Sequence, residues 1–538
     1  MPLPVIPLTA GCALIALALY KFIVHPAFLS PLSKVPSAHW TSRVSPLWIY
    51  YHRLQQNDTV AVHAAHQRLG PIIRLAPNEL SVNSVEGGIR TIYAGGFEKG
   101  TWYSNYFSNY GVEPMFAMEG HSEHSKRKRM LSNVYAKSTL RASPALAKQT
   151  DIILDDRLYP RLKAAAESET PIEMYDVFAA VTMDFVSEYV FGMKNGTNFV
   201  QNVEEGTKLF RDFKARQKYT FWPQELPSFT SFMSRIGLKW LLVPEWVGKA
   251  NNDLEAWLMR MCDNAEKTLR SIDNGDKENV EDYPTVYAQL RNSLLKDLSK
   301  SEQDLCVEDT VQSLRLEIAS ELIDHTLAGF DTSSITLTWL AWQLSRPENS
   351  HWQKNLHQEL KSSVPSTHDA KALDSLPILH AISMETLRLH AAIPGNQPRI
   401  TPPNTSLGDA EQGILYPNLP SNVRVQSQAW TLHRNPKIFP DPEKWDPSRW
   451  LPTPSKDMTR WFWAFGSGGR MCVGSNLAML DMKATIAGVW GKFKTETVRD
   501  EGMVPNGGYM AEPLGVGPGG KKGIGKGREF LICRLTKL

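Results

Sequence analysis

The sequence predicts a mainly α-helical protein with a small β region, preceded by an N-terminal transmembrane helix. Three observations support this: an apolar segment at the start of the chain, a long proline-free stretch near its middle, and short runs near residues 72–82 and 396–430 that suit strands. The chain has 538 residues, 42% of them apolar, which is enough for a substantial core. No proline- or serine-rich linker divides it after the N-terminus, so we expect one large domain.

The apolar segment at the start is long enough to cross a membrane. From Val5 to Val24 the sole charged residue is Lys21. About 20 residues at a rise of about 1.5 Å span roughly 30 Å, the thickness of the hydrocarbon core of a bilayer. A cleaved signal peptide is the alternative, but it carries positive charge before its apolar stretch, and here Lys34 and Arg43 follow it.

This charge pattern predicts a single-pass anchor over residues 1–24 with the rest of the chain on the cytosolic side. Residues 25–38 are rich in proline, so we expect them to end the helix and to form a stiff connector. Residues 39–538 then form the globular domain. The sequons at Asn57, Asn195 and Asn404 should be unglycosylated on that side of the membrane.

Composition excludes several classes of function. A net charge of +3 is too small to favour nucleic acid as a partner. The five cysteines are scattered and form no C-x-x-C pair, which argues against zinc ribbons and iron–sulfur clusters and fits a reducing compartment. The run from Gly520 to Gly527 nearly spells a phosphate-binding loop, but it lacks the final Ser or Thr. No nucleotide-binding module is therefore expected.

Two helices are expected in the second half of the chain. Residues 311–345 contain no proline and are followed by Pro347, which predicts one helix of about 35 residues, or about 52 Å, enough to cross a domain. A second helix is expected from near Pro377 to His390. The proline- and glycine-rich run after it, from Ile393 to Arg399, suits a loop and strand passing over a cofactor.

The most informative segment is Phe465-Gly-Ser-Gly468-Gly-Arg470-Met-Cys472-Val-Gly474. A thiolate on haem iron needs backbone amides directed at its sulfur, and tight or left-handed turns at Gly468 and Gly474 would allow a loop to provide them. Arg470 supplies a guanidinium for a haem propionate, and Phe465 can cover the sulfur. The alternative is a glycine-rich surface turn with an incidental cysteine.

Two further clusters need an explanation. Asp331 and Thr332 lie within the long helix, where short polar and β-branched residues are unfavourable. A carboxylate and a hydroxyl there could hold water and transfer protons, whereas a polar helix face toward solvent is the alternative. Glu385 and Arg388 share a helix face. Alone they would form a weak exposed pair, but with Arg449 they could form a buried structural network.

These motifs together resemble the cytochrome P450 monooxygenases, a family with one mainly helical fold. Cys472 lies in a segment that resembles the haem-binding loop, the residues around Thr332 resemble the oxygen-activating stretch, and Glu385-x-x-Arg388 resembles the E-x-x-R pair, with Arg449 as its third member. The resemblance implies haem b with Cys472 as axial ligand to the iron. It also implies that Asp331 and Thr332 are catalytic.

The resemblance also implies which residues bind the haem propionates. His124 and Lys128 stand where the family usually has Trp and Arg, so their contacts with the propionates are open. Arg399 resembles another propionate-binding arginine. Lys126 and Arg129 lie on a different helix face from Lys128. They could meet an acidic electron donor, or they could form a solvated charged surface.

The function implied is oxygen insertion into an apolar small molecule, with electrons from NADPH through a separate flavoprotein reductase. Members with this layout are typical of fungi, are anchored in the endoplasmic reticulum and tailor terpenoids, polyketides or alkaloids. Aromatic residues in 102–116, 210–222 and 240–246 suggest a sizeable apolar substrate, or merely core packing. A haem-thiolate isomerase or dehydratase acting on a peroxide and a non-enzymatic haem-thiolate sensor are the alternatives.

Overall fold

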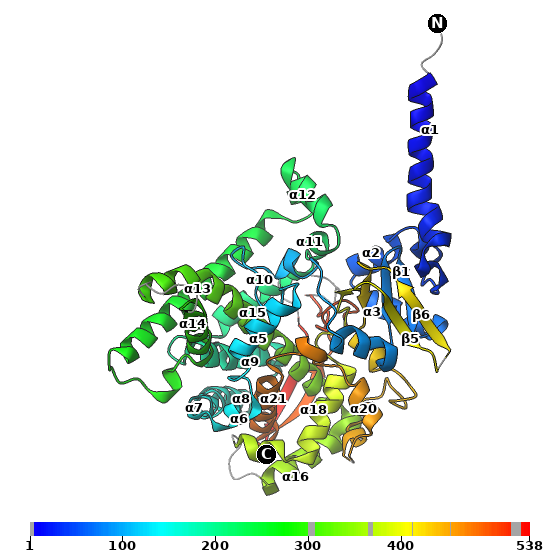
Figure 1. The fold of residues 1–538 in the computed structure, drawn as a ribbon. Coiled ribbons are helices and arrows are strands. Elements are labelled where there is room, and N and C mark those ends of the chain that lie inside the picture. Colours follow the sequence, from blue (N-terminus) through cyan, green and yellow to red (C-terminus); the bar gives the residue numbers. More distant parts are fainter. Residues whose placement is uncertain (1–4, 300–306, 364–368, 412, 452, 518–528) are drawn as a thin grey trace.

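A computed structural model describes residues 5–299, 307–363, 369–411, 413–451, 453–517 and 529–538. The expected mainly helical fold with small sheets is confirmed (Figure 1). The run from Gly520 to Gly527 lies outside the described residues.

The N-terminal helix extends away from the body of the protein (Figure 1). It comprises α1 (Val5–Leu19) and a wider helical segment from Tyr20 to Leu29. Residues Ala10–Leu29 are long and apolar enough to cross a membrane. The expectation that the helix stops before Pro26 is wrong, because the wider turns continue through Pro26 and the amide of Ser30 still donates to the carbonyl of His25 at 2.8 Å.

The long central helix is α15 (Val307–Ser345), which packs against α9 (Met174–Phe191), α13 (Glu245–Asp273), α14 (Thr285–Leu298), α18 (Pro377–Leu389) and α21 (Ser475–Trp490). It starts four residues earlier than expected, and the second expected helix is α18. Gly329 allows the close approach of α9, since a Cβ at this position would lie 2.6 Å from Cγ2 of Val186. This packing, rather than a break in the helix, explains the mid-helix glycine.

Shorter helices surround this core. They are α2 (Leu47–Leu54), α3 (Asp58–Leu69), α4 (Ser104–Phe107), α5 (His121–Leu131), α6 (Lys137–Ala142), α7 (Pro144–Asp151), α8 (Tyr159–Glu167), α10 (Val203–Gln217), α11 (Phe221–Glu225), α12 (Pro227–Arg235), α16 (Ser350–Ser363), α17 (Ala370–Asp374), α19 (Ala429–Leu432) and α20 (Lys456–Trp461).

The strands form three small sheets. The largest has the order β1-β2-β7-β4, built from β1 (Ile72–Ala76), β2 (Glu79–Val82), β7 (Arg424–Gln426) and β4 (Arg399–Ile400). The hairpin of β5 (Thr405–Asp409) and β6 (Ile414–Leu419) lies beside it. The third sheet, which the sequence analysis did not foresee, has the order β3-β9-β8, with β3 (Ile172–Glu173), β9 (Ile532–Lys537) and β8 (Phe493–Arg499).

Candidate functional site

The cysteine loop connects α20 to α21, and it directs backbone donors at the sulfur of Cys472. Burial raises the pKa of this thiol above its usual value. Hydrogen bonds from the N–H groups of Gly474 and Ser475 to the sulfur offset part of that rise. The side chain of Cys472 is nevertheless exposed, so a ligand could reach the sulfur. The amide of Cys472 donates to the carbonyl of Phe465 at 3.0 Å, which closes the loop.

The two glycines of the motif differ in conformation. Gly468 has a φ of +71°, and a Cβ there would lie 2.1 Å from the carbonyl oxygen of Tyr93, so a side chain is excluded on both grounds. Gly474 has a φ of −84° and precedes α21. The turn at Gly474 is therefore tight but not left-handed, and its contribution is the N–H group directed at the sulfur.

Two cations hold the loop in place. The guanidinium of Arg470 donates to the carbonyls of Met118, Glu119 and Gly120 at 2.6, 2.7 and 3.0 Å. The ammonium of Lys128, on α5, donates to the carbonyls of Gly469 and Met471, both at 2.9 Å. Lys128 thus contacts the loop directly, which the sequence analysis did not anticipate.

Further basic side chains gather near Arg470. Arg399 donates to the hydroxyl of Tyr103 at 3.0 Å. Lys99, which the sequence analysis missed, is buried, donates to the carbonyl of Phe116 and lies 3.9 Å from the centre of the Tyr103 ring. A lone lysine in a loop carries no motif, so no sequence signal could have identified it.

The electrostatics of these cations suit an anionic ligand. Burial, together with Arg399 and Arg470, lowers the pKa of Lys99 well below its usual value. Burial and Arg399 lower that of Arg470 to about 10. Burial, Arg470 and Lys99 lower the pKa of His124 to about 3, so this imidazole is neutral at pH 7. A group with two carboxylates, such as haem with its propionates, would relieve this repulsion and fits the residues present.

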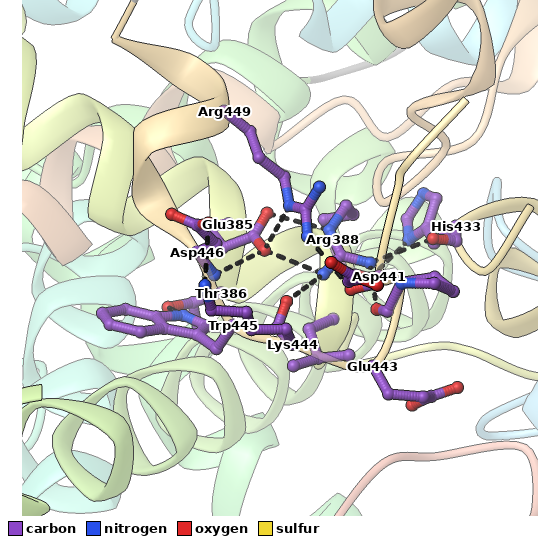
Figure 2. A network of polar contacts seen from close by, with 12 residues as sticks. Glu385, Thr386, Arg388, His433, Asp441, Glu443, Lys444, Trp445, Asp446 and Arg449 are labelled. Atoms are coloured by element: carbon purple, nitrogen blue, oxygen red, sulfur yellow. Dashed lines mark hydrogen bonds and ion pairs between the residues drawn. The ribbon is translucent and has the colours of Figure 1, made fainter. Parts of the chain in front are cut away.

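Beneath the loop, the buried Glu385 and Arg388 form a network with Arg449, which is half-buried (Figure 2). Arg388 contacts both carboxylate oxygens of Glu385 at 2.8 Å, and the Nε of Arg449 lies 3.3 Å from Oε1 of Glu385. The remaining donors of Arg388 bind the carbonyls of His433, Pro442 and Lys444. The guanidinium is therefore fully satisfied, as a buried charge requires.

His433 connects this network to the cysteine loop, a role that the sequence analysis missed. Its Nε2 accepts from the amide of Trp463 at 2.7 Å, so its Nδ1 carries the proton and donates to the carbonyl of Arg388 at 2.7 Å (Figure 2). Burial lowers the pKa of His433 to about 3, which keeps the ring neutral as this bridge requires. The network fixes the segment from which the loop starts.

Asp331 and Thr332 point in different directions from α15. The carboxylate of Asp331 is buried, forms an ion pair with Lys214 of α10 and accepts from Gln217 at 3.3 Å. Thr332 is half-buried, and its hydroxyl donates to the carbonyl of Ala328 at 2.9 Å. Ala328 is exposed although α15 is the central helix, so this face can receive a ligand.

Comparison with known proteins decides the family. The family model for Cytochrome P450 matches residues 43–510. The chain belongs to the cytochrome P450 family. It is similar to cytochrome P450 monooxygenase tazI of Aspergillus terreus, with 26% identity over 94% of this chain and 97% of the relative. Cytochrome P450 monooxygenase aba2 of Botryotinia fuckeliana is 27% identical over 88% of this chain and 83% of the relative. Both relatives are fungal oxidoreductases by name.

The basic side chains of α5 in this P450 lie on different sides of the helix, as the helix geometry predicts. Lys126 forms an ion pair with Asp297 of α14 at 2.6 Å, and Arg129 is exposed. Arg127 is buried and pairs with Glu317 of α15. Lys126 is thus engaged within the chain, which leaves Arg129 as the accessible cation of the pair considered for an electron donor.

The aromatic segments of this P450 serve different purposes. Trp102 and Tyr103 form a cluster with Phe107, Phe116 and Tyr509. By contrast, Phe210 and Phe213 of α10 pack on Phe330 of α15 and belong to the main core. Trp240 and Trp246 are 55% and 41% exposed, so they do not line an interior site.

Proposed function

We propose that this chain is a membrane-anchored haem-thiolate monooxygenase that inserts one oxygen atom from O2 into an apolar small molecule. The reaction is R–H + O2 + NADPH + H⁺ → R–OH + H2O + NADP⁺, with electrons supplied through a separate flavoprotein reductase. The observation that carries the proposal is the loop that directs two backbone N–H groups at the sulfur of Cys472, which is accessible to a ligand.

Haem b, when bound, would supply the oxygen-activating and electron-transfer chemistry. Cys472 would be its axial ligand, with Gly474 and Phe465 setting the surroundings of the sulfur. Arg399 and Arg470 would bind the propionates, with Lys128 and the neutral His124 close by. Lys128 would also keep the loop against α5 through the carbonyls that it binds.

The proton relay depends on two neighbouring side chains with different tasks. Thr332 lies on the ligand-accessible face of α15, where its hydroxyl can bind and orient water. Asp331 lies beside it but is paired with Lys214, so it would exchange protons only when that ion pair opens. Glu385, Arg388 and Arg449 would act structurally, beneath the loop.

The proposed location is the endoplasmic reticulum membrane, with the catalytic domain in the cytosol, where a reductase can reach it. The apolar helix Ala10–Leu29 supports membrane anchoring. Exposed apolar side chains on and after α12, among them Phe232, Trp240 and Leu241, offer a second surface for lipid. From the resemblance to fungal members of the family we propose a secondary metabolite as substrate, a terpenoid, a polyketide or an alkaloid.

The test starts with the full-length protein, reduced under carbon monoxide. We expect the red-shifted Soret band that a thiolate ligand produces, and we expect Cys472→Ala to lose it. Incubation with reductase, NADPH and a panel of apolar compounds should then give substrate-dependent NADPH oxidation and oxygenated product. A peroxide isomerase would form product without the reductase, and a sensor would form none. A Cys472→Ala protein that keeps the band would contradict the proposal.

A further inference from the structure

A cavity lies where α6, α17 and α21 meet, away from the face of Thr332. Its volume is about 340 Å³, which is enough for a small molecule. Among the described residues that line it, none belongs to α15. Phe465 and Ser475, which flank Cys472 in the sequence, form part of its wall. The cavity therefore adjoins the cysteine loop without being part of the proposed substrate face.

Three cations converge on one carboxylate in this cavity. Asp374, the last residue of α17, pairs with Lys137 of α6 at 2.8 Å and with Lys483 of α21 at 2.9 Å. It also accepts a hydrogen bond from Arg141 of α6. Burial alone would raise the pKa of Asp374, but the hydrogen bonds from these cations outweigh it and lower the pKa. The carboxylate is therefore charged, and each cation shares it with two others.

The lining has an excess of positive charge. Lys137, Arg141 and Lys483 contribute +3 and Asp374 contributes −1, which leaves +2 among the described lining residues. His380 adds no charge at pH 7, because burial and Lys483 lower its pKa from 6.5. A ligand with two negative charges would neutralise this excess.

Hydrogen-bond donors of the cations are left over. The side chain of Lys483 is 3% exposed, and Asp374 is its acceptor among the described side chains. An ammonium carries three donors and a guanidinium five, so one carboxylate cannot satisfy all three cations. A buried charge needs such partners to offset its lost hydration. A group with several acceptor oxygens would supply them.

The rest of the wall is apolar. It is formed by Leu140, Met384, Phe462, Phe465, Met479 and Leu480. An inorganic anion would leave this surface in contact with water, whereas an apolar body attached to the anion would cover it. A phosphate monoester combines such a body with about two negative charges at neutral pH and three acceptor oxygens.

The position of the cavity favours a soluble ligand. α6, α18 and α21 lie at the end of the molecule opposite the apolar helix α1 (Figure 1). A phospholipid in a membrane crossed by α1 would not reach this end. A flat protein surface would not reach the buried ammonium of Lys483 either.

We propose that the cavity between α6, α17 and α21 binds a soluble organic phosphate monoester, with its phosphate on Lys137, Arg141 and Lys483. This site goes beyond the proposed monooxygenase function, which assigns no ligand to this part of the protein. The bound molecule contacts the cysteine loop through Phe465, so it acts as an effector and not as the substrate. Asp374 opposes its binding, because the carboxylate and the phosphate are both negative and use the same donors.

The test is calorimetry on the haem-loaded, full-length protein with 4-phenylimidazole on the iron, which closes the haem site to the probe. The probe is 2-naphthyl phosphate, and 2-naphthol and inorganic phosphate are its controls. The dissociation constant of the ester should be about 10-fold or more below that of either control, the range for hydrogen bonds to charged groups. Equal affinities for the ester and either control would overturn the inference.

Two variants should change the affinity for the ester in opposite directions. Arg141→Gln removes a charged donor and should raise the dissociation constant about 10-fold, whereas Asp374→Asn removes the competing charge and should lower it. A cluster with a purely structural role would lose affinity in both variants. Lys354→Gln, which removes a positive charge from an exposed position of α16, is the matched control and should change nothing.

Melting temperatures are recorded first for every variant. If Asp374→Asn does not fold, Lys137→Met takes its place and should weaken binding of the ester about threefold, as expected for a half-exposed ammonium. Unchanged affinity in Arg141→Gln would overturn the inference. If that variant also lost reductase-supported turnover, the cavity would belong to the contact with the electron donor.

Discussion

At the scale of single residues, Asp331 and Thr332 show that adjacent positions on one helix can have separate environments. Burial alone would lower the pKa of Lys214, but the carboxylates of Asp331 and Glu512 outweigh it and raise it. The ammonium therefore stays charged and holds Asp331 toward α10. Thr332, one residue further, is turned by about 100° around the helix axis onto the ligand-accessible face.

The first prediction concerns the Thr332 hydroxyl. Thr332→Ala should keep the carbon monoxide band and ligand affinity, because the thiolate loop and the apolar surface are unchanged. Product formed per NADPH should fall and hydrogen peroxide should rise, since a positioned proton donor contributes about 10^2- to 10^4-fold in rate. Parallel assays of NADPH consumed, product formed and peroxide released measure how the electrons are divided between product and peroxide.

Thr332→Ser is the control, because it retains a hydroxyl on the same atom and should recover much of the coupling. Asp331→Asn should slow turnover further, since an amide does not exchange protons as a carboxylate does. Unchanged coupling in Thr332→Ala would rule out a relay at this residue and would favour proton delivery by the substrate or a peroxide isomerase.

At the scale of elements, a buried charge network attaches α11 to the sheet. Glu225, the last residue of α11, accepts from Arg53 at 2.9 Å, from Arg424 at 2.8 Å and from the indole of Trp102 at 2.8 Å. Arg53 and Arg424 also pair with Glu79 of β2. One carboxylate thus joins α2, α11, β7 and the aromatic segment (Figure 1).

The second prediction is that Glu225→Gln lowers the free energy of unfolding by about 3 to 5 kcal/mol. Breaking a buried ion pair leaves the charges of Arg53 and Arg424 insufficiently neutralised in the protein interior. Thermal unfolding should show the loss, and limited proteolysis should cut faster between α11 and α12. Glu204→Gln, exposed on α10, should change neither measurement. Equal stabilities of the two variants would contradict the network's importance.

The same network gives a pH dependence. Burial alone would raise the pKa of Glu225, but Arg424 and Arg53 outweigh it and lower it to about 2 from the usual 4.5. The unfolded state therefore binds more protons between these values, and this contribution to stability is lost as the pH falls from 4.5 toward 2. Glu225→Gln should show a smaller loss of stability than the parent protein over that interval.

At the scale of the whole molecule, the N-terminal apolar helix is joined to the sheet. Arg74 of β1 is fully buried and donates to the carbonyl of Pro26 at 2.9 Å and to that of Ala76 at 3.2 Å. Large apolar side chains between Leu14 and Val24 are exposed, as a lipid-facing helix requires. We therefore expect the boundary between the proposed anchor and the body to lie near Pro26.

The third prediction follows from that boundary. Removal of residues 1–24 should shift the protein from the membrane pellet toward the supernatant and leave haem binding intact, because Pro26 and its contact with Arg74 are retained. Centrifugation and the carbon monoxide spectrum measure both effects. Removal of residues 1–34 should also lower the melting temperature, since it leaves buried Arg74 without that acceptor. Loss of haem from the shorter truncation would show that the boundary is misplaced.

The sequence by itself determined the family, the cysteine loop, the long central helix, the helix that starts at Pro377, and the apolar N-terminal segment. It could do so because each depends on local order: glycine and arginine at fixed spacing around Cys472, a proline-free stretch over 311–345, and an apolar run of membrane length. Glu385 and Arg388 were identifiable for the same reason. These features depend on residues that are close together in the sequence, so they can be predicted without knowing which distant residues they contact.

The tertiary structure alone decided which side chains have partners. Lys99 and His433 carry no motif, and their importance arises from residues elsewhere in the chain, namely Phe116 beside Lys99 and Trp463 beside His433. It likewise decided that Asp331 pairs with Lys214 and that the helix continues past Pro26. The physical reason is that burial and charge pairing are set by the environment of a side chain, which only the folded chain creates.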